Sequence, residues 1–113
     1  NILNNAKDEL IKKDEKKRFI FLDTTEINEK VIISIKDTAG GIPLEFISKI
    51  FDSRFTSKDK NKASGLGLYM SKVIIEKHMK ATLLVSNKEF EYQGDDYIGA
   101  EFKIILKTGE NSI

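Results

Sequence analysis

The chain lacks cysteine and tryptophan, and it has one proline and one histidine among its 113 residues. Without cysteine it can form neither a disulfide framework nor a cysteine-ligated metal site. Its 19 basic and 18 acidic residues nearly cancel, so net charge gives no argument for binding nucleic acid. No hydrophobic run approaches the roughly 18 residues of a membrane-spanning helix. We therefore expect a domain that neither binds nucleic acid nor inserts into a membrane.

The length fits a single domain, residues 1–113, and a hydrophobic content of 40% is enough for one core. The sequence opens on NILNNAKDEL, a helical pattern without a cap or a lead-in. We interpret the chain as a fragment of a larger protein, truncated at its N-terminus. The polar, lysine-rich stretch at 56–64 is short enough to be a loop rather than a linker.

Hydrophobic periodicity predicts the order helix, two strands, long loop, helix, two strands. Leu3, Ala6 and Leu10 share one helical face and predict a first helix over residues 1–13. The other predicted elements are strands at 18–23, 30–37, 81–87 and 100–106, a short helix at 43–51 beginning on Pro43, a main helix at 66–78, and a polar turn at 91–99. The apolar face of the main helix is expected to contain Leu66, Tyr69, Met70, Val73 and Ile74. This order predicts an α+β fold, with helices covering one face of a mixed or antiparallel sheet.

Gly65 and Gly67 stand directly in front of the main helix, in the stretch KASGLGLYMSKVII. Glycine is a poor helix former, but at a helix start it lets the backbone approach a ligand closely. The first N–H groups of a helix attract anions, above all phosphate. The stretch therefore points to a phosphate site, with an ordinary loop before a helix as the alternative. Lys58, in the preceding polar stretch, could reach the same phosphate as a point charge.

Asn1 and Asn5 lie one helical turn apart on the polar face of the first predicted helix. The carbonyl oxygen of asparagine is a hard ligand, and it suits a Mg²⁺ ion that keeps several waters and shares phosphate oxygens. Two solvated surface asparagines are the alternative interpretation.

Asp37 ends a predicted strand and has the same parity as Ile33 and Ile35, so its carboxylate should face the core. A carboxylate there needs a partner. Because an ionised carboxylate only accepts hydrogen bonds, it suits an exocyclic amino group such as that of adenine. Two glycines follow, the second being Gly41, where backbone can pass close to a flat ligand. An Asx turn before the glycines is the alternative.

Taken together, these stretches resemble the ATP-binding catalytic domain of bacterial sensor histidine kinases, in the superfamily that includes gyrase, the MutL repair protein and a heat-shock chaperone. NILNNAKDEL resembles the N box, DTAGGIP the G1 box, IFDSRFTSK the F box and ASGLGL the G2 box, in the family's order over about residues 1–106. The resemblance implies a two-layer α/β sandwich of the Bergerat type, with a flexible ATP lid at about 38–64.

The resemblance also implies roles for individual residues. Asn5 matches the asparagine that binds Mg²⁺, and the resemblance implies that Asn5 is the catalytic residue. Asn1 matches the N-box asparagine that precedes the Mg²⁺-binding one. Asp37 matches the carboxylate that receives the adenine amino group, and Gly41 matches the second G1 glycine beneath the base. The contacts to phosphate fall on Lys58, Gly65, Leu66, Gly67 and Leu68.

The chain departs from the family pattern at five positions, which are Asp8, Thr38, Ala39, Ser53 and Ala63. Asp8 stands where many members carry a basic residue, and Thr38 stands where they often carry asparagine. These departures concern the lid and the phosphate contacts rather than the adenine and metal residues. Phe51 of the F box, with Phe55, is a candidate either for the core or for docking on a partner surface.

The function implied is that of an ATP-dependent protein-histidine kinase domain with ATP and Mg²⁺ as cofactors. Its γ-phosphoryl group would pass to a histidine on a separate phosphoacceptor and dimerisation domain, because His78 does not match the acceptor motif. A response regulator would act downstream of a homodimeric full-length kinase, located in the cytoplasm or forming the cytoplasmic part of a membrane-bound sensor. The alternatives are a non-catalytic nucleotide-binding signalling module and a serine-kinase relative of the anti-sigma-factor type.

Overall fold

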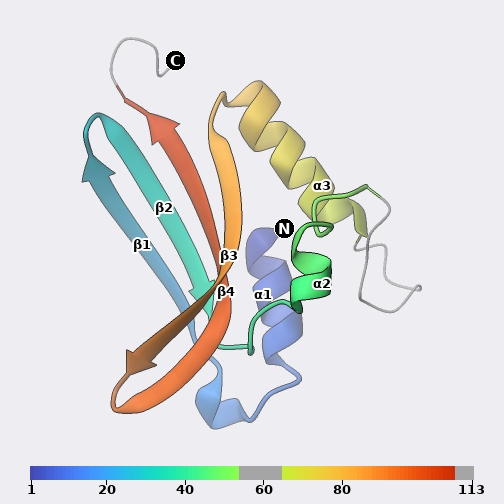
Figure 1. The fold of residues 1–113 in the computed structure, drawn as a ribbon, viewed down its shortest axis with the longest axis vertical. Coiled ribbons are helices and arrows are strands. Elements are labelled where there is room, and N and C mark those ends of the chain that lie inside the picture. Colours follow the sequence, from blue (N-terminus) through green and yellow to red (C-terminus); the bar gives the residue numbers. More distant parts are fainter. Residues whose placement is uncertain (54–64, 109–113) are drawn as a thin grey trace.

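The computed structural model describes residues 1–53 and 65–108. Its four strands form one sheet in the order β1-β2-β4-β3 (Figure 1). The strands are β1 (Ile20–Ile27), β2 (Lys30–Asp37), β3 (Thr82–Tyr92) and β4 (Asp95–Lys107). All pairings in the described sheet are antiparallel. The predicted α+β class is therefore confirmed. Of the two sheet types that were predicted, mixed and antiparallel, the described sheet is antiparallel.

The helices lie together on one side of this sheet (Figure 1). They are α1 (Ile2–Leu10), α2 (Leu44–Ile47) and α3 (Gly65–Val73), and α3 continues into the π-helical turn η2 (Ile74–His78). A short 3₁₀ turn, η1 (Glu15–Lys17), precedes β1. The predicted two-layer arrangement follows from these positions. No helix within the described ranges is long and apolar enough to cross a membrane.

The core lies between the helices and the inner face of the sheet. Phe102 and Leu83 are its largest fully buried side chains. Strand register places Ile35 opposite Phe102, and the helical layer contributes Ile2 and Ile75 to the same cluster. Burying each such side chain contributes about 1.5–3 kcal/mol relative to leaving it exposed. This cluster holds α1 and α3 against the strands that carry the candidate site.

The first helix differs from its prediction in both its end and its buried face. Ile2 is buried together with Ala6 and Leu10, whereas Leu3 is 47% exposed. The buried face therefore follows an i, i+4, i+8 spacing. It differs from the predicted face only in its first residue, which is Ile2 instead of Leu3. The helix ends at Leu10 rather than at residue 13. The guanidinium of Arg18 donates hydrogen bonds to the carbonyls of residues 11 and 13, and so stabilises the turn that follows.

The β3–β4 hairpin is longer than predicted, because residues 91–99 are almost entirely strand. The connection consists of Gln93 and Gly94 alone, both with positive φ (50° and 86°), as a type I′ hairpin turn requires. A cluster of aromatic rings, on the face away from the helices, joins the hairpin to β1 and to the residue before β1. Its members are Phe19, Phe21, Phe90, Tyr92 and Tyr97. These contacts between residues distant in sequence stabilise the end of β3 and the start of β4, where the polar sequence of residues 91–99 predicted a turn.

β1 also runs further than predicted, to Ile27 instead of 23, and turns into β2 through Asn28 and Glu29. Two helical predictions need correction as well. α2 ends at Ile47 instead of 51, and Pro43 is its N-cap instead of its first helical residue. The predicted buried face of α3 is partly wrong, since the helix turns Ile75 into the core and leaves three side chains exposed, Tyr69, Met70 and Ile74.

Candidate functional site

Asp37 lies at the end of β2 with its side chain buried, only 4% exposed. Its Oδ1 accepts hydrogen bonds from the N–H groups of Ala39 (3.0 Å) and Ala100 (3.1 Å). Burial raises the pKa of this carboxyl, the two N–H groups act in the opposite direction, and the charge of Glu9 raises the pKa further. Within the described residues no fully buried side-chain oxygen or nitrogen lacks a partner. Oδ2 takes neither of these two N–H groups.

Gly99 on β4 allows the sheet to approach Asp37 closely. A Cβ atom at this position would lie 1.6 Å from the carbonyl oxygen of Asp37 and 2.9 Å from its Oδ1. Only glycine fits such a contact. Gly99 is not among the predicted site residues, because its polar stretch predicts a turn. An isolated glycine within a strand pattern, which signals close backbone approach, could have identified it.

The loop after Asp37 is hydrogen-bonded to β3 and β4. The N–H of Gly40 donates to the carbonyl of Ile98 (2.8 Å). Gly41 has φ +86°, and a Cβ there would lie 2.9 Å from Oδ1 of Asn87. Asn87 is not among the site residues predicted from the sequence. Its parity with Leu83, the same argument that was used for Asp37, places it on the inner face of β3.

Thr38, one of the departures from the family pattern, has a structural role in this chain. Its buried hydroxyl accepts a hydrogen bond from the N–H of Phe19 (3.0 Å) and donates one to the carbonyl of Lys17 (2.6 Å). The hydroxyl thereby links the loop after β2 to the chain that enters β1.

The asparagines of α1 lie beside the first turn of α3. A Cβ atom at Gly67 would lie 3.5 Å from Cγ of Asn1, so the two helix starts are adjacent. Asn1 is the exposed N-cap of α1, and its side chain makes no capping bond. Asn5 is half-buried one turn later, and its N–H donates to the carbonyl of Asn1 (2.9 Å). The structure thus brings Asn1 and Gly67 together, and Asn5 lies one helical turn from Asn1.

The remaining candidates for phosphate contact are distributed around the same turn. Gly65 is the first residue of α3 and Leu66 is the second, while Leu68 is half-buried against the core. Lys58 lies outside the described residues, as does Phe55. His78 is exposed at the end of η2.

Helix α1 connects the two ends of the candidate site. Asn1 lies at Gly67, whereas Glu9 is close enough to Asp37 to influence its pKa. Eight residues of helix separate Asn1 from Glu9, about 12 Å at 1.5 Å per residue. Helix α1 thus contacts both β2, which carries Asp37, and α3.

The donor set around Asn5 fits Mg²⁺ bound together with phosphate. In the described part of the chain, no three His, Cys, Asp or Glu side chains gather into a possible metal site. Asn5 would supply such an ion with an amide oxygen, and Mg²⁺ readily takes most of its other ligands from phosphate and water.

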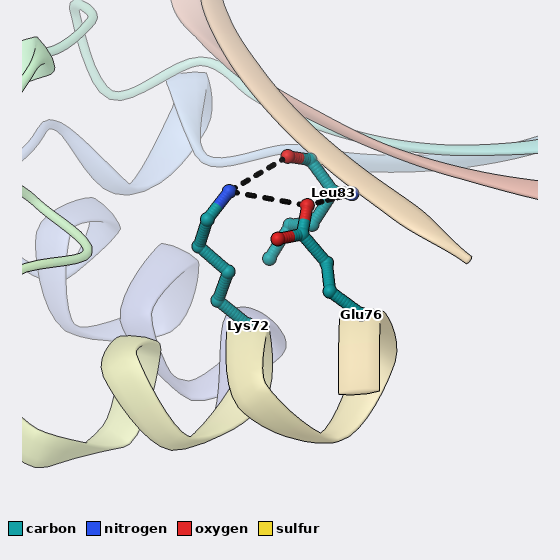
Figure 2. A network of polar contacts seen from close by, with 3 residues as sticks. All are labelled: Lys72, Glu76 and Leu83. Atoms are coloured by element: carbon teal, nitrogen blue, oxygen red, sulfur yellow. Dashed lines mark hydrogen bonds and ion pairs between the residues drawn. The ribbon is translucent and has the colours of Figure 1, made fainter. Parts of the chain in front are cut away.

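A polar network ties α3 and η2 to the edge of the sheet (Figure 2). The Lys72 ammonium lies 3.2 Å from Oε2 of Glu76 and 3.5 Å from the carbonyl of Leu83, and the N–H of Leu83 donates to the same Glu76 oxygen (3.2 Å). The ammonium also lies 4.8 Å from the ring centre of Phe51. That ring packs edge-to-face on Phe102. Phe51 of the F box is therefore attached to the core.

We expect Glu76→Gln to lower stability at neutral pH by about 0.5 kcal/mol, a value that reflects its partial exposure. The N–H of Leu83 holds the pKa of the Glu76 carboxyl below its ordinary value, with a smaller effect from Lys72. A lowered folded-state pKa stabilises the protein above the unfolded pKa, and this stabilisation is lost as the pH falls through the folded-state value. Urea unfolding of both proteins should show a difference at neutral pH that disappears in acid, once the pH lies below the folded-state pKa of Glu76.

The matched control for this prediction is Glu26→Gln, because Glu26 is exposed on β1. It should change stability at neither pH. A Glu76→Gln penalty that stayed constant from neutral to acid pH would contradict the assigned role of the carboxylate charge.

The chain belongs to the family described as histidine kinase-, DNA gyrase B-, and HSP90-like ATPase, which it matches over residues 1–110. It is 35% identical to the sensor protein kinase WalK of Staphylococcus haemolyticus over 83 residues, covering 69% of this chain and 13% of WalK. It is 44% identical to the sensor kinase CckA of Brucella abortus over 46 residues, covering 41% of this chain and 5% of CckA. The chain thus spans a small part of the length of these relatives.

Solved structures share the fold. The catalytic domain of the histidine kinase ThkA has a TM-score of 0.69 at 25% identity, over 95% of this chain and 64% of that one. A mycobacterial sensor histidine kinase, MprB, has a TM-score of 0.67 at 24% identity, over 91% and 67%. The predicted resemblance to the ATP-binding catalytic domain of sensor histidine kinases is confirmed.

Proposed function

We propose that the chain binds Mg-ATP and donates its γ-phosphoryl group to a histidine on a separate phosphoacceptor and dimerisation domain. The observation that carries the proposal is the environment of Asp37. Its carboxylate is buried and anchored through Oδ1 by two backbone N–H groups. This leaves Oδ2 to accept a hydrogen bond from the amino group of adenine.

The other site residues have roles along the same ligand. Gly41 lies beneath the base, and Asn1 borders the phosphates. Asn5 binds Mg²⁺, which neutralises the charge that develops on the phosphates. The phosphates bind at the start of α3, through Gly65, Leu66, Gly67 and Leu68, and Lys58 of the polar stretch adds a positive charge. The adjacency of Asn1 and Gly67 supports this arrangement.

Phosphoryl transfer in this account depends on positioning and on charge neutralisation. An imidazole nitrogen of the acceptor histidine attacks the γ-phosphorus, the bond from phosphorus to the bridging oxygen breaks, and ADP leaves. The imidazole proton passes to solvent. The chain supplies the bound, oriented nucleotide, while the nucleophile comes from the other domain, so the chain alone does not autophosphorylate.

The wider setting belongs to the same proposal. Residues 1–113 form the catalytic domain, with the lid at about 38–64. The acceptor domain belongs to the same kinase, which is a homodimer, and a response regulator receives the phosphoryl group. The chain works in the cytoplasm, either free or as part of a membrane-bound sensor. The similarity to two sensor kinases supports this setting.

The test is to incubate the chain with labelled ATP, Mg²⁺ and the phosphoacceptor domain, and then to measure the acid and base stability of the labelled product. A phosphohistidine, labile in acid and stable in base, is expected only when both domains are present. Label that is stable in acid would indicate the serine-kinase alternative. ATP binding without any transfer would indicate the non-catalytic signalling module.

A further inference from the structure

The loop of residues 37–42 is held on β3 and β4 at three points. At its start, Asp37 accepts from the N–H of Ala100 (3.1 Å). In its middle, the N–H of Gly40 donates to the carbonyl of Ile98 (2.8 Å). At its end, Ile42 binds the side chain of Asn87. The first two attachments use backbone groups of β4 that any residue would supply, whereas the third depends on one side chain.

The Asn87 amide makes a paired contact with the backbone of Ile42. Its Oδ1 accepts from the N–H of Ile42 (2.7 Å), and its Nδ2 donates to the carbonyl of the same residue (2.8 Å). A primary amide is suited to this task, because it presents one acceptor and one donor side by side. Asn87 is also the register partner of Ala100, which binds Asp37. The two ends of the loop are thus attached to neighbouring positions of the β3–β4 pair.

The same amide sets the position of Gly41. A Cβ atom at Gly41 would lie 2.9 Å from Oδ1 of Asn87 and 3.3 Å from Cγ2 of Ile98. These two side chains therefore occupy the space that a side chain at position 41 would need. The Asn87 amide thereby helps to set the distance between the Gly41 backbone and the Asp37 carboxylate.

We propose that Asn87 is a positioning residue for base recognition: by fixing Ile42 and Gly41 relative to Asp37, it makes the site select a purine that carries a 6-amino group. The inference rests on the proposed function, since it assumes that the base lies between the Gly41 backbone and Asp37. Asn87 itself need not contact the nucleotide. Its loss leaves the N–H and the carbonyl of Ile42 without these partners, so the loop shifts away from the geometry that aligns the base with Asp37.

The experiment measures the dissociation constants of ATP and of inosine triphosphate, in which a carbonyl oxygen replaces the 6-amino group. Wild-type protein should bind ATP more tightly, because Oδ2 of Asp37 repels that oxygen. Asn87→Leu, which retains bulk but cannot hydrogen-bond, should weaken ATP binding about tenfold. Binding of inosine triphosphate should change less than about twofold. The preference for ATP should therefore largely disappear.

Two controls separate positioning from general stability. Ser86→Ala alters the exposed neighbouring residue on the other face of β3 and should leave the preference unchanged. Glu76→Gln weakens the attachment of β3 to η2, away from the loop, and should lower stability without changing the preference. Asn87→Asp keeps the side-chain volume and the acceptor for Ile42 N–H but loses the donor. It should reduce the preference even if the leucine variant fails to fold.

The outcomes distinguish this inference from the proposed function. If wild-type protein binds neither nucleotide, the ATP site itself is wrong and the inference fails with it. If wild-type protein prefers ATP and the folded Asn87 variants keep the same preference with lower melting temperatures, Asn87 is a structural residue only. In that case the inference is overturned while the proposed function stands.

Discussion

Gly99→Ala is expected to destabilise the domain by at least about 3 kcal/mol and to abolish nucleotide binding. The added Cβ would lie 1.6 Å from the carbonyl oxygen of Asp37, so β4 and the end of β2 must move apart. This movement would break the bond from Ala100 to Asp37 and the bond from Gly40 to Ile98. Urea unfolding and ATP titration measure the two effects. A folded variant with wild-type stability and affinity would contradict the close approach.

The matched control is Gly94→Ala in the β3–β4 turn. Gly94 has positive φ (86°), but no atom lies within 4 Å of its added Cβ. This substitution should cost about 1 kcal/mol through backbone strain alone. It should leave ATP affinity unchanged, because the turn lies outside the loop that holds Asp37.

Asn5→Ala is expected to lower the rate of Mg²⁺-dependent phosphoryl transfer about 100-fold or more. The amide oxygen is the one protein ligand that the account gives to the metal, and alanine is a good helix residue. The change should therefore leave the melting temperature close to that of the wild type. Nucleotide binding in the absence of Mg²⁺ should also be little affected, since Asp37 retains the base.

Asn4→Ala provides the control, because Asn4 is the exposed neighbour of Asn5 on the same helix. Its transfer rate should match that of the wild type. Transfer by Asn5→Ala at the wild-type rate, with the acceptor domain supplied, would remove Asn5 from the metal site.

The parts of the fold that could be predicted from the sequence are those that local pattern determines. β2 occupies the predicted residues 30–37, because its alternation continues without interruption to Asp37. The same parity correctly predicted that the Asp37 side chain is buried. A helix at the two glycines was correctly predicted, and it begins at Gly65, one residue before the predicted start.

The parts that could not be predicted depend on contacts between distant residues. The polar stretch at 91–99 forms strands because all its residues except Gln93 and Gly94 pair across the hairpin, and because the ring of Tyr92 meets those of Phe19 and Phe21. The choice of Ile2 over Leu3 for the core is decided by how α1 packs, since both are equally apolar. Gly99 and Asn87 become important only when β4 and β3 lie against the loop after Asp37. For this reason the sequence indicated the buried carboxylate of Asp37 but not the residues that hold it.

The central claim is that Asp37 receives the base of ATP, and the most direct test is calorimetric titration with ATP of the wild type and of Asp37→Asn. The variant keeps the shape of the side chain but loses its charge. It also presents an amide N–H₂ either to the adenine amino group or to the N–H groups of Ala39 and Ala100. We predict measurable binding by the wild type and a loss of at least about thirtyfold in the variant, roughly 2 kcal/mol. Equal affinity of the two folded proteins for ATP would contradict the account.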